Sequence, residues 1–282
     1  MKSSWLGIFI AIGVLYYGVF RSAPNPKIFL DAHALLLVIG GTLAASLIAF
    51  PFRKFEDIIA LLLFSVLKKR KSSLLNQAKD LIGLSLQKKL KQPLMITKSE
   101  KHPFMKEACY LLSHEHLNSE QLRAVLSKRS DFFKKKYLSD AKVLNAIGKF
   151  PPAFGLLGAT TGMISMMSNI GGGQQDKIGE AMAIALVATF WGIAMANFVL
   201  LPLADFAART VLEDQHVRNM IIEAMVSIRD DEDPRYVMEK VLAFMPPHYR
   251  KELEVMTAHL NKPPQAQPTS TVIPMNLKIK KG

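Results

Sequence analysis

Few side chains in this 282-residue chain are placed to do acid–base chemistry inside a membrane. Between Phe150 and Pro202 the only charged residues are Asp176, Lys177 and Glu180. Glu180 is the one carboxylate within an apolar run, and it lies near the end of that run, where water reaches it. A proton pathway across a bilayer usually requires an acid deep in the membrane. We therefore expect any proton that crosses here to use an acid supplied by another subunit.

Other patterns of catalytic or metal-binding residues are missing from the sequence. Cys109 is the single cysteine, so an intramolecular disulfide is excluded, and we expect it to lie in a helix core. His114 and His116 are two residues apart and point in different directions on a helix, so they cannot share a metal as an i, i+4 pair would. The glycines at 171–173 lack the Gly-Lys-Ser/Thr of a phosphate loop and favour a flexible turn. No nucleophile–base pair is visible. We predict neither an enzyme nor a metal or cofactor site.

Two apolar runs, at about 151–170 and 178–203, are each about the 20 residues that a helix needs to cross a bilayer. Both runs repeat small residues every three or four positions and carry several hydroxyls: Gly155, Gly158, Gly162, Ala188, Gly192 and Ala196, with Thr160, Thr161, Ser165 and Thr189. Small side chains let helices approach closely in lipid, where the hydrophobic effect does not drive association. The pattern predicts two tightly packed helices that surround something polar.

Two more apolar runs, Ser4–Phe20 and Ala32–Phe50, precede a basic segment. The alternative for the first run is a cleaved signal peptide, but no small-residue cleavage site is evident before the second run. Residues 52–148 contain 20 Lys and Arg against 9 Asp and Glu, a net charge of +11. Lys and Arg mark the cytoplasmic side of membrane proteins. Four spans then place the basic segment and both termini in the cytoplasm, with the spans in the bacterial inner membrane.

The basic segment also raises the alternative of nucleic-acid binding. Its lysine clusters have few interleaved aromatics and are tethered between spans, so we predict no nucleic-acid partner. The predicted fold is all-α, a four-span integral membrane protein with a helical cytoplasmic domain. Its parts are residues 1–51, the first two transmembrane helices; 52–148, the basic cytoplasmic domain; 149–203, transmembrane helices 3 and 4; 204–261, a cytoplasmic helical tail; and 262–282, a disordered C-terminus.

Several segments resemble the MotA branch of the MotA/TolQ/ExbB proton-channel group. They occur in one order along the chain: Leu35–Ser46, Phe150–Gly158, Ala183–Gly192 with Pro202, and Asp233–Arg235 with Phe244–Pro247. The resemblance implies a stator subunit of the flagellar motor, a homo-pentamer in membrane lipid around a MotB-like one-span subunit that carries the ion-binding Asp. Ions that cross at their interface drive rotation of a FliG-like rotor protein. An ExbB/TolQ-like motor that energises an outer-membrane process is the alternative, although those relatives usually have three spans.

The resemblance assigns roles to four residues along the ion path. Pro152 and Pro202 match the family's two functional prolines at the inner ends of the third and fourth spans. Thr189 matches a hydroxyl position that faces the ions, and its third-span counterpart falls on Ala159, which offers no oxygen. Sodium-driven relatives have hydroxyls at both positions, so we expect protons here. Taken alone, the prolines are better explained as simple span-end signals. Thr189 could as easily donate to its own i−4 carbonyl.

The expected rotor contact departs from the family pattern of an Arg and a Glu eight residues apart. The best ungapped match, Ala78–Gln87, puts Lys79 at the Arg and Gln87 at the Glu. Lysine keeps the positive charge but loses the bidentate fork, and glutamine loses the negative charge. Either the rotor has changed its complementary charges, or the contact has moved to nearby basic residues: Lys68, Lys69, Arg70, Lys88 and Lys89.

Overall fold

The computed structural model describes residues 2–22, 26–67, 70–89, 102–113, 116–172 and 175–257. Within these ranges every regular element is a helix, which confirms the all-α prediction. The predicted disordered segment 262–282 lies outside the described residues, as do Lys68 and Lys69.

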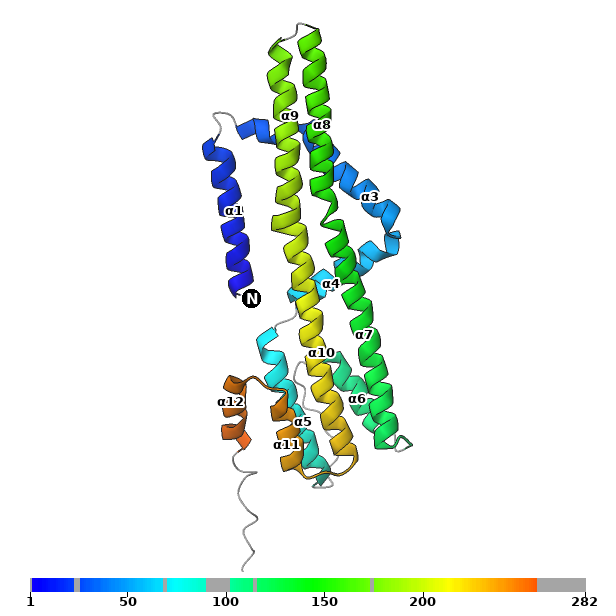
Figure 1. Ribbon diagram of the computed structural model, residues 1–282. Helices are drawn as coiled ribbons and strands as arrows, with labels where there is room; N and C mark the ends of the chain where they lie inside the picture. The colour runs from blue at the N-terminus through cyan, green and yellow to red at the C-terminus, as the bar shows by residue number, and fades with distance from the viewer. Residues whose placement is uncertain are drawn as a thin grey trace, which may run out of the picture.

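The first part of the chain forms helices that lie beside a long central pair (Figure 1). Their bounds are α1 (Lys2–Ser22), the 3₁₀ helix η1 (Pro26–Leu30), α2 (Ala32–Leu35), the π-helical turn η2 (Leu36–Gly40), α3 (Gly41–Ala49) and α4 (Phe52–Leu67). The elements α2, η2 and α3 follow one another without a break and form one helix from Ala32 to Ala49.

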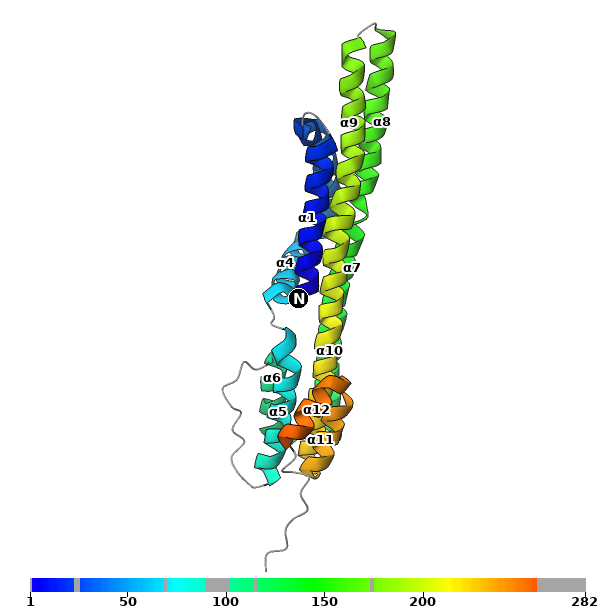
Figure 2. The ribbon, with the colours of Figure 1, turned by 90° about the vertical axis from the view of Figure 1, so that its left-hand side faces the viewer.

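Two antiparallel rods dominate the molecule and run most of its length (Figures 1 and 2). The first rod is α7 (Ser119–Ile147) followed by α8 (Phe150–Gly171). The second is α9 (Gln175–Ala194), the π-helical η3 (Met195–Leu200) and α10 (Leu201–Arg229). At one end four shorter helices pack against the rods: α5 (Arg70–Lys89), α6 (Pro103–Ser113), α11 (Pro234–Ala243) and α12 (Pro247–Thr257). At the opposite end α8 and α9 project beyond the other helices.

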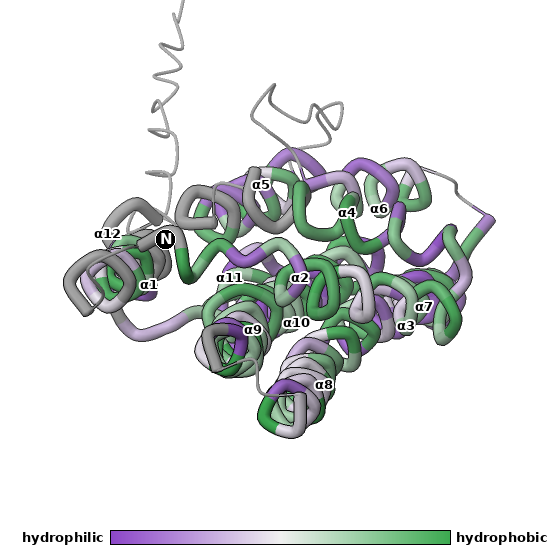
Figure 3. The backbone as a smooth tube through the Cα atoms, turned by 90° about the horizontal axis from the view of Figure 1, so that it is seen from above, coloured by the Kyte–Doolittle hydropathy of each residue, from purple (hydrophilic) through white to green (hydrophobic). Residues whose placement is uncertain are grey.

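By length and composition, two of the described helices could cross a membrane: Ala32–Ala49 and the apolar part of Lys177–Arg229. Phe9–Gly18 is a shorter apolar helix. The third predicted span, α8, contains many Gly, Thr and Pro residues, which lower its mean hydropathy. Seen along the long axis, α8 and α9 end side by side (Figure 3).

Glycines allow the backbones of α8 and α9 to touch. A Cβ added at Gly155 would lie 2.9 Å from the carbonyl oxygen of Ala188, and one at Gly192 would lie 2.6 Å from that of Pro151. Farther out, a Cβ at Gly162 would lie 2.8 Å from the carbonyl oxygen of Ala181. Because these clashes are with backbone atoms, no side-chain rotation relieves them. The close packing that the small-residue spacing predicts is present.

The helix Ala32–Ala49 packs onto this pair. A Cβ at Gly41 would overlap the ring of Phe154 on α8. Ala34 and Val38 are buried against Val187 and Ala188 of α9. The indole Nε1 of Trp191 donates to the carbonyl of Phe29 at 2.6 Å, which ties the start of this segment to α9.

The end of the molecule where the shorter helices pack against α7 and α10 is called the broad end below. Its helices share one apolar core. Buried members come from α5, α6, α7, α10, α11 and α12, among them Leu81, Phe104, Leu122, Met225 and Val237. Cys109 on α6 is partly buried against this core, as its helix-core assignment predicts.

This core contains buried ionic side chains that close a hydrogen-bond network. His102 Nε2 lies 2.7 Å from Asp214 Oδ1, and Arg218 Nε donates to Asp214 Oδ2 at 2.7 Å. The Arg218 guanidinium also stacks on Phe133, 3.7 Å from the ring centroid, and on Phe104 at 4.6 Å. A fully buried carboxylate is costly unless it is paired and hydrogen-bonded. The network meets this condition for Asp214.

A second buried carboxylate fastens α4 to α7. Lys54 Nζ donates to Asp140 Oδ1 at 2.6 Å, and the Asp140 side chain is completely buried. This hydrogen bond raises the pKa of Lys54. Asp140 Oδ2 has no other partner among the described residues.

We predict that Lys54→Met will destabilise the protein because it leaves Asp140 as an uncompensated buried charge. Breaking a fully buried pair costs about 3–5 kcal/mol, and the partial exposure of Lys54 reduces this to about 2–3 kcal/mol. Thermal unfolding of the detergent-solubilised protein measures the effect. The matched control is Lys89→Met, which removes an exposed lysine from Asp233 and is expected to leave the midpoint nearly unchanged. Equal midpoints for the two variants would contradict the role of burial.

We also predict that Gly192→Ala will disrupt the α8–α9 contact, because its methyl group meets the Pro151 carbonyl oxygen. Gly179→Ala on the same helix is the control, since nothing lies within 4 Å of its Cβ position. Alanine favours a helix over glycine by about 1 kcal/mol. The control is therefore expected to be neutral or stabilising, and Gly192→Ala to lower the unfolding midpoint. If both variants keep the wild-type midpoint, the two backbones are not in contact.

Candidate functional site

Each rod departs from regular α-helix at one point, and the two departures lie at about the same height along the rods. In the first rod α7 ends at Ile147, and the turn Gly148–Lys149 leads into α8. In the second rod the π-helical η3 leads into α10 at Leu201. A Cβ added at Gly148 would lie 2.8 Å from Leu201 Cδ2, so the two interruptions face each other. The structure thereby brings Gly148, four residues before Pro152, against Leu201, the residue before Pro202, although the two prolines are 50 positions apart in the sequence.

The two prolines have different effects on their helices. Pro152 lies in the first turn of α8, where its missing N–H would have no partner within the helix. Pro202 lies inside a continuous helix, directly after η3. There the N–H of Leu201 donates to Ala196, five residues back, in place of the usual i−4 carbonyl. A proline cannot donate to its own i−4 carbonyl, and such π turns mark local departures from the α-helix. Of the two prolines, Pro202 is therefore the one positioned to allow a bend, within the continuous helix of the second rod.

Thr189 is partly buried on α9, and its Oγ1 donates to the Ala185 carbonyl at 3.1 Å. The hydroxyl hydrogen of Thr189 is thus bound within the helix, while the hydroxyl oxygen can still accept a hydrogen bond. The Thr189 Cα lies 3.3 Å from the Cβ position of Gly155, and Ala159 lies one helical turn farther along α8. Thr160 and Thr161 donate to the carbonyls of Leu157 and Gly158 on their own helix.

Among the described residues of α8 and α9, Glu180 and Lys177 are the charged side chains with a described environment, and both are exposed. The buried carboxylates Asp140 and Asp214 belong to the broad end of the molecule. The described ranges contain no cluster of three or more His, Cys, Asp or Glu side chains able to hold a metal. The centre of the α8–α9 pair therefore has hydroxyl and backbone oxygens but no titratable group.

Five residues of the expected rotor contact lie on α5, which packs against α10 and α11: Arg70, Lys79, Gln87, Lys88 and Lys89. Lys79 is partly buried, and the Gln87 Oε1 is buried without a partner in the described structure. Arg70 is the first residue of α5.

Lys88 and Lys89 are engaged within the chain. Lys88 Nζ donates to the carbonyls of Ile228 and Arg229 at 2.6 and 3.1 Å and pairs with Asp231. Lys89 pairs with Asp233 at 2.6 Å, and this hydrogen bond lowers the pKa of that carboxylate. Both lysines thereby hold α5 to the turn between α10 and α11.

Sequence reasoning missed the two buried ionic contacts. Asp214 and Arg218 are four apart on one helix, a spacing that could have suggested a pair. His102 is 112 residues from Asp214, and Lys54 is 86 from Asp140, so neither contact has a local signal.

Comparison with known proteins adds an independent line of argument. Residues 96–220 match the model of the MotA/TolQ/ExbB proton channel family. Motility protein A of Bacillus subtilis (strain 168) is 24% identical over 250 residues, which cover 87% of this chain and 91% of that protein. Chemotaxis protein PomA of Vibrio alginolyticus is 26% identical over 227 residues, with 74% and 81% covered.

Solved structures share the fold over nearly the whole chain. The flagellar MotAB stator complex from Bacillus subtilis gives a TM-score of 0.79 at 21% identity, covering 90% of this chain and 99% of the matched one. C. jejuni MotAB gives a TM-score of 0.76 at 18% identity, with 87% and 96% covered. The matched segment contains the α7–α8 rod and most of the second rod, including both prolines. Over residues 96–220 the chain is therefore similar to the MotA/TolQ/ExbB proton channel family, and over nearly its whole length it shares the fold of the two MotAB structures.

Proposed function

We propose that this chain is a stator subunit of the bacterial flagellar motor, which forms an ion channel with a MotB-like one-span subunit. The observation that carries the proposal is the α8–α9 pair, whose closely packed centre offers oxygens but no acid. An ion path here requires a carboxylate from a second protein. The similar solved structures are of MotAB complexes, which supports such a partner.

The proposed topology has four spans in the inner membrane and both termini in the cytoplasm. Residues 1–51 and 149–203 supply the spans, 52–148 and 204–261 form the cytoplasmic part, and 262–282 form a tail. Several copies, a pentamer in this proposal, surround the partner in membrane lipid. The near full-length similarity to motility proteins favours this function over an ExbB/TolQ-like motor for an outer-membrane process.

In this proposal the ion path passes Thr189 and Ala159. A desolvated sodium ion needs several oxygen ligands, whereas a proton needs a titratable group and a hydrogen-bonded path. Ala159 offers no side-chain oxygen, whereas the Thr189 oxygen keeps its lone pairs while its hydroxyl donates to the Ala185 carbonyl. The missing oxygen ligand at Ala159 favours protons. One charge that crosses 100 mV releases about 2.3 kcal/mol, so torque requires many crossings.

The proposed rotor contact with a FliG-like protein lies on α5, at Lys79 and Gln87. The proposed contact also includes the basic residues Lys68, Lys69 and Arg70. Lys88 and Lys89 act differently in this proposal, since their contacts with the α10–α11 turn hold α5 in place. A force on α5 then passes directly into the second rod.

We predict that this chain alone conducts no ions, whereas co-expression with its one-span partner creates a proton leak. The measurement is cytoplasmic acidification after a drop in external pH, in sodium and in potassium media. Replacing the partner's membrane Asp with Asn is the matched control and is expected to abolish the leak. Substantial proton flux with this chain alone would overturn the proposal, and a leak that follows external sodium would overturn the choice of ion.

We predict that Pro202→Ala abolishes motility while membrane insertion and expression stay intact. Alanine restores an N–H and favours a straight α-helix by about 3 kcal/mol over proline, so the bend at η3 is lost. Pro152→Ala is expected to impair motility less, because Pro152 lies in a first turn. Swimming speed and the amount of protein in membranes measure both effects. Normal swimming of the Pro202 variant would show that this proline only marks a helix boundary.

A further inference from the structure

A cavity of about 720 Å³ lies between α6, α7 and α10 at the broad end. Its wall combines basic side chains with aromatic rings, among them Lys128, Lys136, Arg218, Phe132 and Phe133. Pockets for small organic ligands have volumes of about 300–1,000 Å³ and combine apolar surface with a few placed polar groups. The cavity therefore has the size and composition of a site for a small ligand.

Arg218 presents a fixed guanidinium to this cavity. Its side chain is only 9% exposed, and its Nε donates to Asp214. The guanidinium carbon lies 3.7 Å from the ring centroid of Phe133 and 4.6 Å from that of Phe104. A guanidinium has five N–H donors, of which Nε carries one. The donors on Nη1 and Nη2 have no acceptor among the described residues, so they are available to a ligand.

Two lysines supply positive charge beside these donors. Lys128 is exposed, and its ammonium has no hydrogen bond or ion pair with another described residue. Lys136 pairs with Asp57 at 3.3 Å, but both side chains are more than a third exposed, and such surface pairs contribute little. The other described cations of the wall, Arg129 and Arg218, are each paired with a carboxylate. The surplus charge at the cavity therefore comes from the two lysines.

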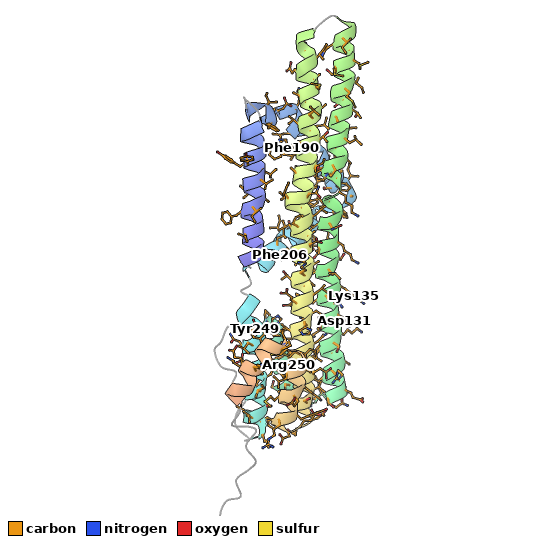
Figure 4. All side chains as sticks on the ribbon, turned by 60° about the vertical axis from the view of Figure 1, so that its left-hand side comes forward. Asp131, Lys135, Phe190, Phe206, Tyr249 and Arg250 are labelled. Carbon is orange, nitrogen blue, oxygen red and sulfur yellow. The ribbon has the colours of Figure 1, made fainter. Side chains whose placement is uncertain are left out.

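Phe132 provides an exposed aromatic face at the edge of the cavity. It is 72% exposed, and it follows Lys128 by one turn of α7. Asp131 and Lys135, which Figure 4 shows on the outer side of α7, are not part of the cavity wall. An exposed ring of this kind can stack against a planar ring of a ligand.

We propose that the cavity binds a nucleotide, an organic phosphate that carries a planar base. The Nη groups of Arg218 donate to phosphate oxygens in the forked geometry that a guanidinium favours. Lys128 and Lys136 offset the further negative charge of the phosphates, and the base stacks on Phe132. A ligand with a single carboxylate would leave one lysine without a counter-charge, so several phosphate charges fit the wall better. The site is independent of ion flow along α8 and α9.

Fluorescence anisotropy of N-methylanthraniloyl-ATP with the detergent-solubilised full chain tests the site. We expect the probe to bind and unlabelled ATP to displace it. ATP is also expected to raise the midpoint of thermal unfolding, because it binds the folded state and joins three helices. Absence of binding that ATP displaces would overturn the proposal.

Two competitors test which part of the ligand is recognised. Pyrophosphate and a short-chain phosphatidylglycerol both carry phosphate without a base, and each is expected to compete several-fold more weakly than ATP. Equal competition by pyrophosphate would refute recognition of the base. Stronger competition by the phospholipid would identify a lipid headgroup as the ligand in place of a nucleotide.

Variants of the wall separate the roles of its residues. Lys128→Glu reverses the charge of an exposed residue, so it is expected to lower the affinity for the probe several-fold without changing the unfolding midpoint of the free protein. Lys142→Glu is the matched control, since Lys142 is also exposed on α7 but lies outside the cavity wall, and it is expected to bind the probe normally. Equal affinities of these two variants would show that the cavity is not the binding site.

Two further variants distinguish the phosphate contact from the base contact. Arg218→Lys keeps the charge but removes the fork, and it is expected to weaken the binding of both ATP and pyrophosphate. Phe132→Ala is expected to weaken the binding of ATP alone, since only the base uses the ring. If Arg218→Lys does not fold, Phe132→Ala and Lys128→Glu still decide the outcome, because both residues are exposed. Equal loss of ATP and pyrophosphate binding in Phe132→Ala would contradict stacking of the base.

Discussion

Direct contact between the backbones of α8 and α9 is the constraint on which the rest of the structure depends. Gly155, Gly162 and Gly192 leave no room for a Cβ against the facing helix. In lipid this closeness supplies the dispersion contacts that hold two helices together. It also sets the spacing of the two rods, because α7 and α10 continue from the same helices. The buried core at the broad end is built around that spacing.

The level of Gly148 and Leu201 divides the molecule into two parts with different physical properties. On one side the contacts are made by small residues and backbone, with hydroxyls that bond to their own helices. On the other side, buried ion pairs and large apolar side chains connect the shorter helices with α7 and α10. A departure from α-helical hydrogen bonding at η3 lies between them. A bend at this level would move the broad end of the molecule as one body, since its helices are cross-connected.

The placement of the charges agrees with this division. Asp214 and Asp140 are buried far from the centre of the α8–α9 pair, and each has a cationic or hydrogen-bonding partner. They stabilise the broad end of the molecule, and the centre of the α8–α9 pair has no titratable group of its own. Lys88 and Lys89 likewise serve a structural contact with the α10–α11 turn. The basic segment 52–148 therefore contains lysines with different roles, and their spacing in the sequence does not distinguish these roles.

The sequence by itself determined the helical class, the close approach of α8 and α9, and the absence of an acid at their centre. These properties are local, since each follows from residue types repeated along one helix. Only the tertiary structure decided that Gly148 meets Leu201, that Lys54 reaches Asp140, and that Lys88 is held by α10. Such contacts join segments 50 to 140 residues apart. They depend on how the rods align, and a one-dimensional pattern contains no record of that alignment.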